Sequence, residues 1–259
     1  MYPLHRLVRL ARTPGAARAL LSWRPFSATS LGLMVALKRR GVEYRTILDG
    51  GANVGQFARA AIETYPDATV LSFEPNPVAA GRFRRNLGTH PRVRLLETAL
   101  GDRDGTITFY PNTYSQASTC LETAAAVGRT LAPITVPIGR LDSVLAVTPL
   151  QPPVLLKLDL QGYEQTALLG AMRTLRQCAH VLVEVDFTGD GPAAFEAVRR
   201  RLAASGFTFS RPLDVLTGPD GRCYQMDALF ESTAPPTSLT ITRGDMIPCL
   251  SIGRNGVSA

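Results

Sequence analysis

The chain has 259 residues, 45% of them hydrophobic and 19% charged, which is ordinary for a folded globular protein. This length excludes a small fold that needs disulfides or metals for its stability. No stretch approaches the ~20 consecutive apolar residues of a transmembrane helix.

The net charge of +7 is concentrated in residues 1–45, which hold nine Lys and Arg residues and a single acidic one, Glu43. Helical spacing predicts two short helices between residues 4 and 23. A third is predicted from Ser30, whose hydroxyl can cap it, to Arg40. The extension is interpreted as a solvated helical arm. Contact with an anionic membrane surface and a homodimer contact stay open as alternatives, and no motif indicates nucleic-acid binding.

From Arg45 the pattern alternates between strands and helices. Strands are predicted at 46–49, 68–73 and 93–100, and helices at 57–65 and 77–86. Such a β-α-β-α-β order is typical of a parallel sheet with right-handed crossovers.

The second half of the chain continues the alternation after an irregular loop at 111–133. The predicted elements are extended segments at 105–110 and 134–138, a strand at 154–159, a helix at 163–178, a strand at 181–185, a helix at 192–205 and an antiparallel pair at 207–209 and 224–230. The expected architecture is α/β: a mostly parallel seven-stranded sheet with helices on both faces and an antiparallel last strand.

The expected domain organisation has three parts. Residues 1–44 form the basic helical extension, residues 45–231 form one domain, and residues 232–259 form a tail rich in Pro, Ser, Thr and Gly.

Residues 49–55, Asp-Gly-Gly-Ala-Asn-Val-Gly, join the first predicted strand to the first helix. Small residues let the backbone turn sharply, and the helix N-terminus offers free N–H groups to a ligand. A dinucleotide site uses G-x-G-x-x-G, but Asn53 stands here at the middle position. Asp49 can accept a hydrogen bond from a ligand amine. The pattern therefore favours the methionine part of S-adenosylmethionine over a pyrophosphate.

Glu74 ends the second predicted strand, 23 residues after Gly51. A carboxylate at this place can accept hydrogen bonds from both hydroxyls of an adenosine ribose. The alternative is a solvated helix start, since Pro77 suits a first helical position.

The chain resembles the FkbM family of methyltransferases over roughly residues 45–230. The resemblance rests on the 49–55 turn and on four further motifs: Phe73-Glu74-Pro75-Asn76, the run Lys157-Leu158-Asp159-Leu160-Gln161-Gly162-Tyr163-Glu164, Leu169-Gly170-Ala171, and Asp227-Ala228-Leu229-Phe230. It implies a Rossmann-like class I methyltransferase fold and S-adenosylmethionine as methyl donor. The implied acceptor is a hydroxyl group of a sugar, glycolipid or natural product. One departure is that the family commonly has Glu where Gln161 stands, so any role of that carboxylate is absent.

The resemblance also places Ala99 and Leu100 beside the adenine, with Asp102 as an acceptor for its amine. The alternative for Asp102 is a plain turn residue. The predicted donor-binding residues are thus Asp49, Gly50, Gly51, Asn53, Gly55, Gln56, Glu74, Pro75, Asn76, Ala99, Leu100 and Asp102.

A hydroxyl acceptor has a high pKa, so its reaction needs a base or a metal ion. Asp159 and Glu184 end neighbouring predicted strands, and Asp159 is the first choice for the base, with a helix N-cap as its alternative. Lys157 should lie on the same side as Asp159 and pair with a carboxylate. Glu164 is expected to orient Asp159 or bind substrate. A divalent cation between Asp159 and Glu184 is a less favoured alternative, and no metal ligand is assigned.

The polar segment 112–119 is expected to border the acceptor pocket as a lid, with a plain surface loop as the alternative. Other functions stay open: an N-methyltransferase acting on a small molecule or peptide, a nicotinamide oxidoreductase, or a non-catalytic nucleotide-binding module. The four scattered cysteines lack metal-ligand spacing, and the Arg-rich N-terminus does not look like a signal peptide. We expect a cytoplasmic protein, alternatively peripheral at the inner membrane surface.

Overall fold

The computed structural model describes residue 19 and residues 25–122, 130–188 and 191–234. The two helices predicted between residues 4 and 23 and most of the predicted tail lie outside these residues. The elements are α3 (Ala28–Lys38), β1 (Thr46–Gly50), α4 (Gln56–Thr64), β2 (Thr69–Phe73), α5 (Pro77–Leu87), β3 (Val93–Leu96), β4 (Ala99–Leu100), β5 (Gly105–Phe109), η1 (Ser115–Ala117), β6 (Ile134–Gly139), α7 (Leu141–Val144), β7 (Val154–Leu158), α8 (Glu164–Leu169), α9 (Met172–Leu175), β8 (Cys178–Asp186), α10 (Gly191–Ala204), β9 (Phe207–Thr217) and β10 (Cys223–Ser232).

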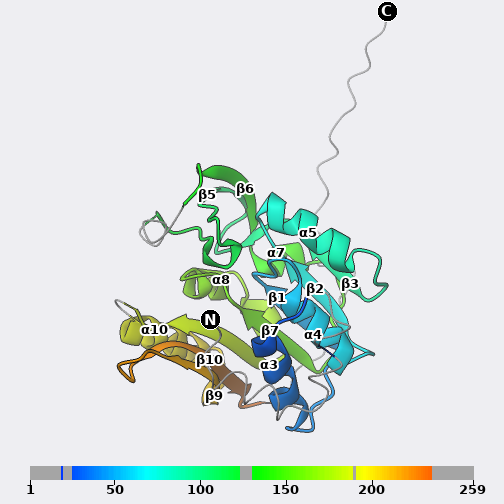
Figure 1. The fold of residues 1–259 in the computed structure, drawn as a ribbon. Helices are drawn as coiled ribbons and strands as arrows, with labels where there is room; N and C mark the ends of the chain where they lie inside the picture. The colour runs from blue at the N-terminus through cyan, green and yellow to red at the C-terminus, as the bar shows by residue number, and fades with distance from the viewer. Residues whose placement is uncertain (1–18, 20–24, 123–129, 189–190, 235–259) are drawn as a thin grey trace, which may run out of the picture.

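A seven-stranded sheet in the order β3-β2-β1-β7-β8-β10-β9 runs through the molecule (Figure 1). The first five strands of this order are parallel, and β10 is antiparallel to both β8 and β9. The predicted α/β fold with a mostly parallel sheet and an antiparallel last strand is confirmed. The strand order reverses between β1 and β7. In open α/β sheets, ligands bind at the carboxyl ends of the strands beside such a reversal.

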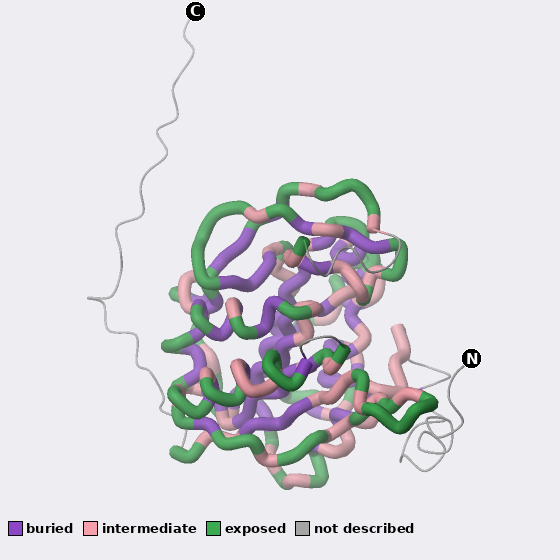
Figure 2. The backbone as a smooth tube through the Cα atoms, turned by 90° about the vertical axis from the view of Figure 1, so that its left-hand side faces the viewer, coloured by how far each residue is buried: buried purple, intermediate pink, exposed green. Residues whose placement is uncertain are grey.

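Successive side chains of the central strands pack into two different cores. Ile47 of β1 and Leu155 of β7 pack with residues of α3, α4 and α5 on one face. Leu48 and Leu156, the next residue in each strand, pack with α7, α8, α9 and α10 on the other face. Because side chains alternate across a strand, both faces of the sheet are covered and the strands are buried (Figure 2).

The third predicted strand, 93–100, is wrong as one continuous element. The N–H group of Thr98 donates to the carbonyl of Leu96 at 3.0 Å, which ends β3 in a tight turn. β4 then pairs with β6 in a separate three-stranded sheet, in the order β4-β6-β5. In Figure 1, β5 and β6 lie at the top of the view, across the molecule from β9 and β10.

The predicted helix 163–178 is also broken, into α8 and α9. At Gly170 a Cβ atom would lie 2.0 Å from the carbonyl oxygen of Gly101, so the chain passes too close to its neighbour for a side chain there. The carbonyl of Gly170 accepts from the N–H of Asp142, and the carboxylate of Asp142 accepts from the N–H groups of Arg173 and Thr174 at the start of α9. These contacts replace the helical hydrogen bonds at the break.

α3 begins before Ser30, because the hydroxyl of Ser27 accepts from the N–H of Ser30 at 3.1 Å and is the actual cap. Met34 and Leu37 of α3 are fully buried among residues of β1 and α4. The division of the chain at residue 44 stays a prediction, but this helix shares the core of the sheet. Within the described ranges, no helix combines the length and apolar character needed to cross a bilayer.

The packing of α3 predicts that Met34→Ala lowers the free energy of unfolding by about 2–5 kcal/mol, because it leaves a cavity in the core. Urea unfolding followed by circular dichroism measures the loss. Lys38→Ala, on the exposed side of the same helix, is the control and should cost no more than about 1 kcal/mol. Equal, small effects of both substitutions would mean that α3 does not belong to the core.

Candidate active site

A cavity of about 770 Å³ opens at the carboxyl ends of β1, β2, β7 and β8, beside the reversal in strand order. The start of α3, the η1 segment, β4 and the β9–β10 pair complete its walls. Its polar lining includes Ser27, Thr29, Ser30, Asn53, Gln56, Glu74, Ser115, Ser118, Lys157, Asp159, Gln161, Glu184, Asp186, Thr188, Asp214, Gln225 and Asp227. This volume is in the range of small-molecule and cofactor sites.

The turn after β1 approaches the end of β7 closely. Gly51 has a φ of 75°, and a Cβ atom there would lie 1.9 Å from the carbonyl oxygen of Asp159. Asn53 also has a left-handed φ, of 49°. The turn therefore requires glycine at Gly51 for contact with the protein's own backbone, and it presents Ala52, Asn53 and Gln56 to the cavity.

Glu74 joins this turn to the end of β2. Its Oε2 atom accepts from the N–H of Asn53 at 2.7 Å, and its Oε1 atom accepts from the N–H of Asn76 at 2.8 Å. Burial raises the pKa of Glu74 to about 7, although both N–H groups oppose this shift. Each carboxylate oxygen has a second lone pair, so Glu74 can still accept hydrogen bonds from a ligand in the cavity. Asn76 instead caps α5 through the N–H of Val78.

Lys157 lies beneath the turn with its Nζ atom 3.3 Å from both Asp49 and Asp159. The expectation that it pairs with a carboxylate is confirmed. Burial opposes its charge, but the carboxylates of Asp159, Asp49 and Glu184 outweigh burial and raise the pKa of Lys157. Asp49 is 0% exposed and does not line the cavity. The structure thus places Asp49 under the turn as the partner of Lys157, away from the direct ligand contact expected for it.

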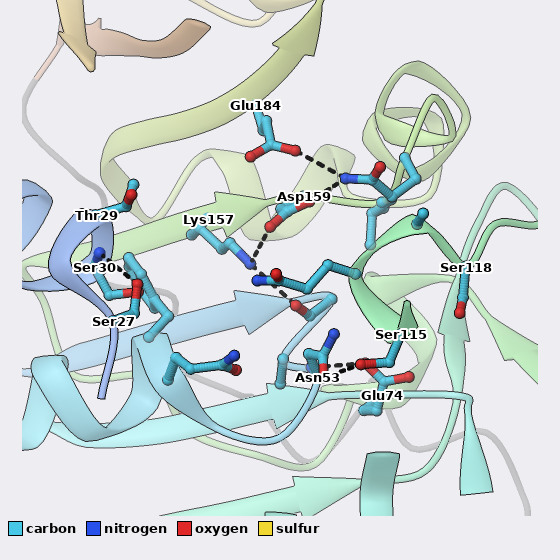
Figure 3. A pocket seen from close by; sticks show the side chains of 18 of the residues that line it. Ser27, Thr29, Ser30, Asn53, Glu74, Ser115, Ser118, Lys157, Asp159 and Glu184 are labelled. Carbon is cyan, nitrogen blue, oxygen red and sulfur yellow. Dashed lines mark hydrogen bonds and ion pairs between the residues drawn. The ribbon is translucent and has the colours of Figure 1, made fainter. Parts of the chain in front are cut away.

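Asp159 and Glu184 meet at one side of the cavity. The side-chain amide of Gln161 donates to Asp159 Oδ1 and to Glu184 Oε1, each at 2.8 Å. Figure 3 shows the two carboxylates directed into the same space, next to Lys157. Burial raises the pKa of Glu184 well above its ordinary value, and the negative charges of Asp159 and Asp227 raise it further. A carboxylate with a raised pKa is a better proton acceptor near neutral pH.

Like Asp49 and Asn76, the predicted site residues Glu164 and Asp102 do not line the cavity. Glu164 accepts from the N–H groups of Leu160 at 2.6 Å and Gly162 at 3.1 Å, so it ties down the loop that follows β7 and does not contact Asp159 by a hydrogen bond. Burial raises the pKa of Glu164 to about 7. Asp102 lies in an exposed turn beside Arg103. By contrast, Ala99 and Leu100 do line the cavity, as expected for them.

Of the remaining predicted donor-binding residues, some line the cavity and others support the turn after β1. Gln56 and Pro75 line the cavity, whereas Gly50 and Gly55 support the turn from behind. A Cβ atom at Gly50 would lie 3.0 Å from Leu158, and one at Gly55 would lie 2.7 Å from Leu87.

The segment 112–119, which contains η1, connects the two halves of the cavity. The hydroxyl of Ser115 donates to Asn53 Oδ1 at 3.0 Å, and the hydroxyl of Thr119 donates to the carbonyl of Gln161 at 2.9 Å. Figure 3 shows Ser115 beside Asn53 and Glu74. The segment 112–119 therefore borders the cavity and bridges the turn after β1 to the backbone of Gln161, while its role as a lid stays a prediction.

An acidic row that extends from Glu184 across the neighbouring strands was not predicted from the sequence. Asp227 of β10 lies opposite Glu184 of β8, and Asp214 of β9 lies opposite Asp227, so three carboxylates form a row across three strands. Asp186 follows Glu184 by two residues, a spacing that puts both on one face and could have been noticed. The row itself depends on strand register, for which the sequence held no signal. Among the described residues, no group of three or more His, Cys, Asp or Glu side chains is arranged to hold a metal ion.

The chain is similar in sequence to known methyltransferases. The sequence model of the Methyltransferase FkbM domain matches residues 49–209. The chain is 32% identical over 150 residues to 2-O-methyltransferase NoeI of Sinorhizobium fredii, covering 53% of this chain and 62% of NoeI. It is 28% identical over 202 residues to Methyltransferase 1 of Beauveria bassiana, covering 70% of this chain and 80% of that protein.

A third relative is the 31-O-demethyl-FK506 methyltransferase FkbM of Streptomyces tacrolimicus, 41% identical over 81 residues, which are 29% of this chain and 31% of that protein. The chain thus spans less than two thirds of the length of NoeI. The family match covers more than half of the chain and includes the turn after β1, Glu74, Asp159 and Glu184. The chain therefore belongs to the FkbM family of methyltransferases.

Proposed function

We propose that this protein is an S-adenosylmethionine-dependent O-methyltransferase that acts on a hydroxyl group of a sugar, glycolipid or other natural product. The observation that carries the proposal is one continuous cavity that holds Glu74 at one end and the Asp159–Glu184 pair at the other. The relatives NoeI, a 2-O-methyltransferase, and FkbM, a 31-O-demethyl-FK506 methyltransferase, are named for methylation at oxygen, which supports the choice of a hydroxyl acceptor.

The residues present fit the donor. Glu74 has the place and the acceptor capacity for the ribose hydroxyls, while Phe73, Ala99 and Leu100 offer an apolar surface to the adenine. Bound S-adenosylmethionine supplies an electrophilic methyl group on a positively charged sulfur, which departs as a neutral thioether. The backbone of the 51–53 turn faces the same space and is held in place by Lys157.

The contacts favour Glu184 over Asp159 as the proton acceptor. The ammonium of Lys157 lies 3.3 Å from Asp159 Oδ2, so Asp159 is already engaged in an ion pair. The pKa of Glu184 is raised, and its carboxylate is correspondingly more basic. In the proposed reaction, the acceptor oxygen forms the new O–C bond while its proton passes to Glu184. Asp159 orients the hydroxyl and keeps Lys157 neutralised.

The donor assignment predicts that S-adenosylhomocysteine binds and that NAD does not, as measured by isothermal titration calorimetry. Glu74→Ala should weaken S-adenosylhomocysteine binding by about 10- to 100-fold, because it removes a charged hydrogen-bond acceptor for the ribose. Glu97→Ala, at an exposed carboxylate beside Arg84, is the control and should bind normally. Preference for NAD, or equal binding by both variants, would contradict the assignment.

The pKa of Glu74 also predicts how binding depends on pH. An ionised carboxylate is the stronger acceptor for hydroxyl groups, so donor binding favours loss of the Glu74 proton. With a pKa of about 7 in the free protein, S-adenosylhomocysteine affinity should rise between about pH 6 and about pH 8 and then level off. The same titration on Glu74→Gln should show no such rise. An identical rise in that variant would assign the pH dependence to another group.

The acceptor assignment is tested by transfer of a radiolabelled methyl group to a panel of free sugars, glycolipids and, as the opposing class, amines. We expect labelling of hydroxyl acceptors. Glu184→Gln should lower the rate by about 10²- to 10⁴-fold with S-adenosylhomocysteine binding retained, because a general base is lost. Glu196→Gln, on the exposed surface of α10, should keep the full rate. Labelling of amines alone would replace the O-methyltransferase assignment by an N-methyltransferase.

A further inference from the structure

Gln161 joins the two carboxylates of the acceptor end through a single nitrogen atom. Its Nε2 atom lies 2.8 Å from Asp159 Oδ1 and 2.8 Å from Glu184 Oε1. An amide nitrogen carries two hydrogens and a carboxylate oxygen only accepts, so one N–H points to each residue.

The backbone of Gln161 is held in a conformation that is uncommon for this residue type. Its φ is 53°, in the left-handed region, and Gly162 follows with a φ of 97°. The hydroxyl of Thr119 donates to the carbonyl of Gln161, and the carboxylate of Glu164 accepts from the N–H groups of Leu160 and Gly162 on either side. These contacts fix the peptide and aim the Gln161 side chain between the carboxylates.

Two carboxylates that face each other repel unless a proton, a cation or a hydrogen-bond donor lies between them. Lys157 meets only one of the two at short range, with its Nζ atom 3.3 Å from Asp159 Oδ2. A divalent cation with oxygen ligands at about 2.0–2.1 Å, as for Mg²⁺, is one way to join such a pair. The Gln161 amide donates to one oxygen of each carboxylate and so joins them without a charge of its own.

We propose that Gln161 is a positioning residue whose side-chain amide joins Asp159 and Glu184 in the place of a divalent cation, so that the acceptor site works without a bound metal. The inference rests on the proposed function only for the role of the two carboxylates. Whether the amide or a cation joins Asp159 and Glu184 can be measured with no acceptor present.

The experiment is Gln161→Glu, which puts a third carboxylate between the other two. We expect this variant to gain binding of Mn²⁺ by about tenfold or more over the wild-type protein, measured from the electron paramagnetic resonance signal of free Mn²⁺. Gln161→Leu removes the amide without adding charge and should gain nothing. Gln225→Glu adds the same charge to the cavity wall from β10 and controls for charge alone.

No gain in Gln161→Glu, or an equal gain in Gln225→Glu, would overturn the inference. S-adenosylhomocysteine binding is measured on the same samples and separates the two proposals: wild-type protein that fails to bind it contradicts the proposed function, whatever the Mn²⁺ result. If Gln161→Glu does not fold, the wild-type protein decides. Tight Mn²⁺ binding by the wild-type protein that Asp159→Asn abolishes would show that a cation already joins the two carboxylates. No tight Mn²⁺ binding by the wild-type protein would support the Gln161 amide as the group that joins them.

Discussion

The ammonium group of Lys157 holds the ends of β1 and β7 together. Its Nζ atom lies 3.0 and 3.1 Å from the carbonyl oxygens of Gly50 and Gly51, and 3.3 Å from the carboxylates of Asp49 and Asp159. A buried charge without partners is costly, so the lysine and its two carboxylates depend on one another. Because one ammonium contacts both the turn after β1 and a carboxylate after β7, the two ends of the cavity keep a fixed separation.

A fixed separation matters for methyl transfer, since a donor and an acceptor held in the right geometry avoid the entropic cost of meeting in solution. The segment 112–119 strengthens the same link from the other side of the cavity. Ser115 contacts the turn and Thr119 contacts the backbone of Gln161. Both connections are hydrogen bonds between segments far apart in the sequence. One ends at the turn after β1, in the proposed donor site, and the other ends at Gln161, beside the two carboxylates of the proposed acceptor site.

The end of the cavity at Asp159 and Glu184 is strongly acidic, because the row Glu184, Asp227 and Asp214 lies there with Asp186 nearby. Carboxylates accept hydrogen bonds from hydroxyl groups, and sugars are recognised in this way through several hydroxyls at once. For the proposed function, this acidic row favours a polyhydroxylated acceptor over an apolar one. Ser27, the N-cap of α3, and Thr29 and Ser30 in its first turn also line the cavity, so the basic N-terminal part of the chain contributes to it.

Local pattern by itself determined the alternation of strands and helices, the turn at residues 49–55, and the carboxylates at the strand ends, since each depends on neighbours in the chain. The tertiary structure alone decided which of these groups face the cavity. Asp49 turned out to pair with Lys157, and Glu164 to bind backbone N–H groups. The acidic row follows from the register of β8, β10 and β9. Such contacts join residues from distant parts of the chain. They are determined by packing and strand register, and no short stretch of sequence contains that information.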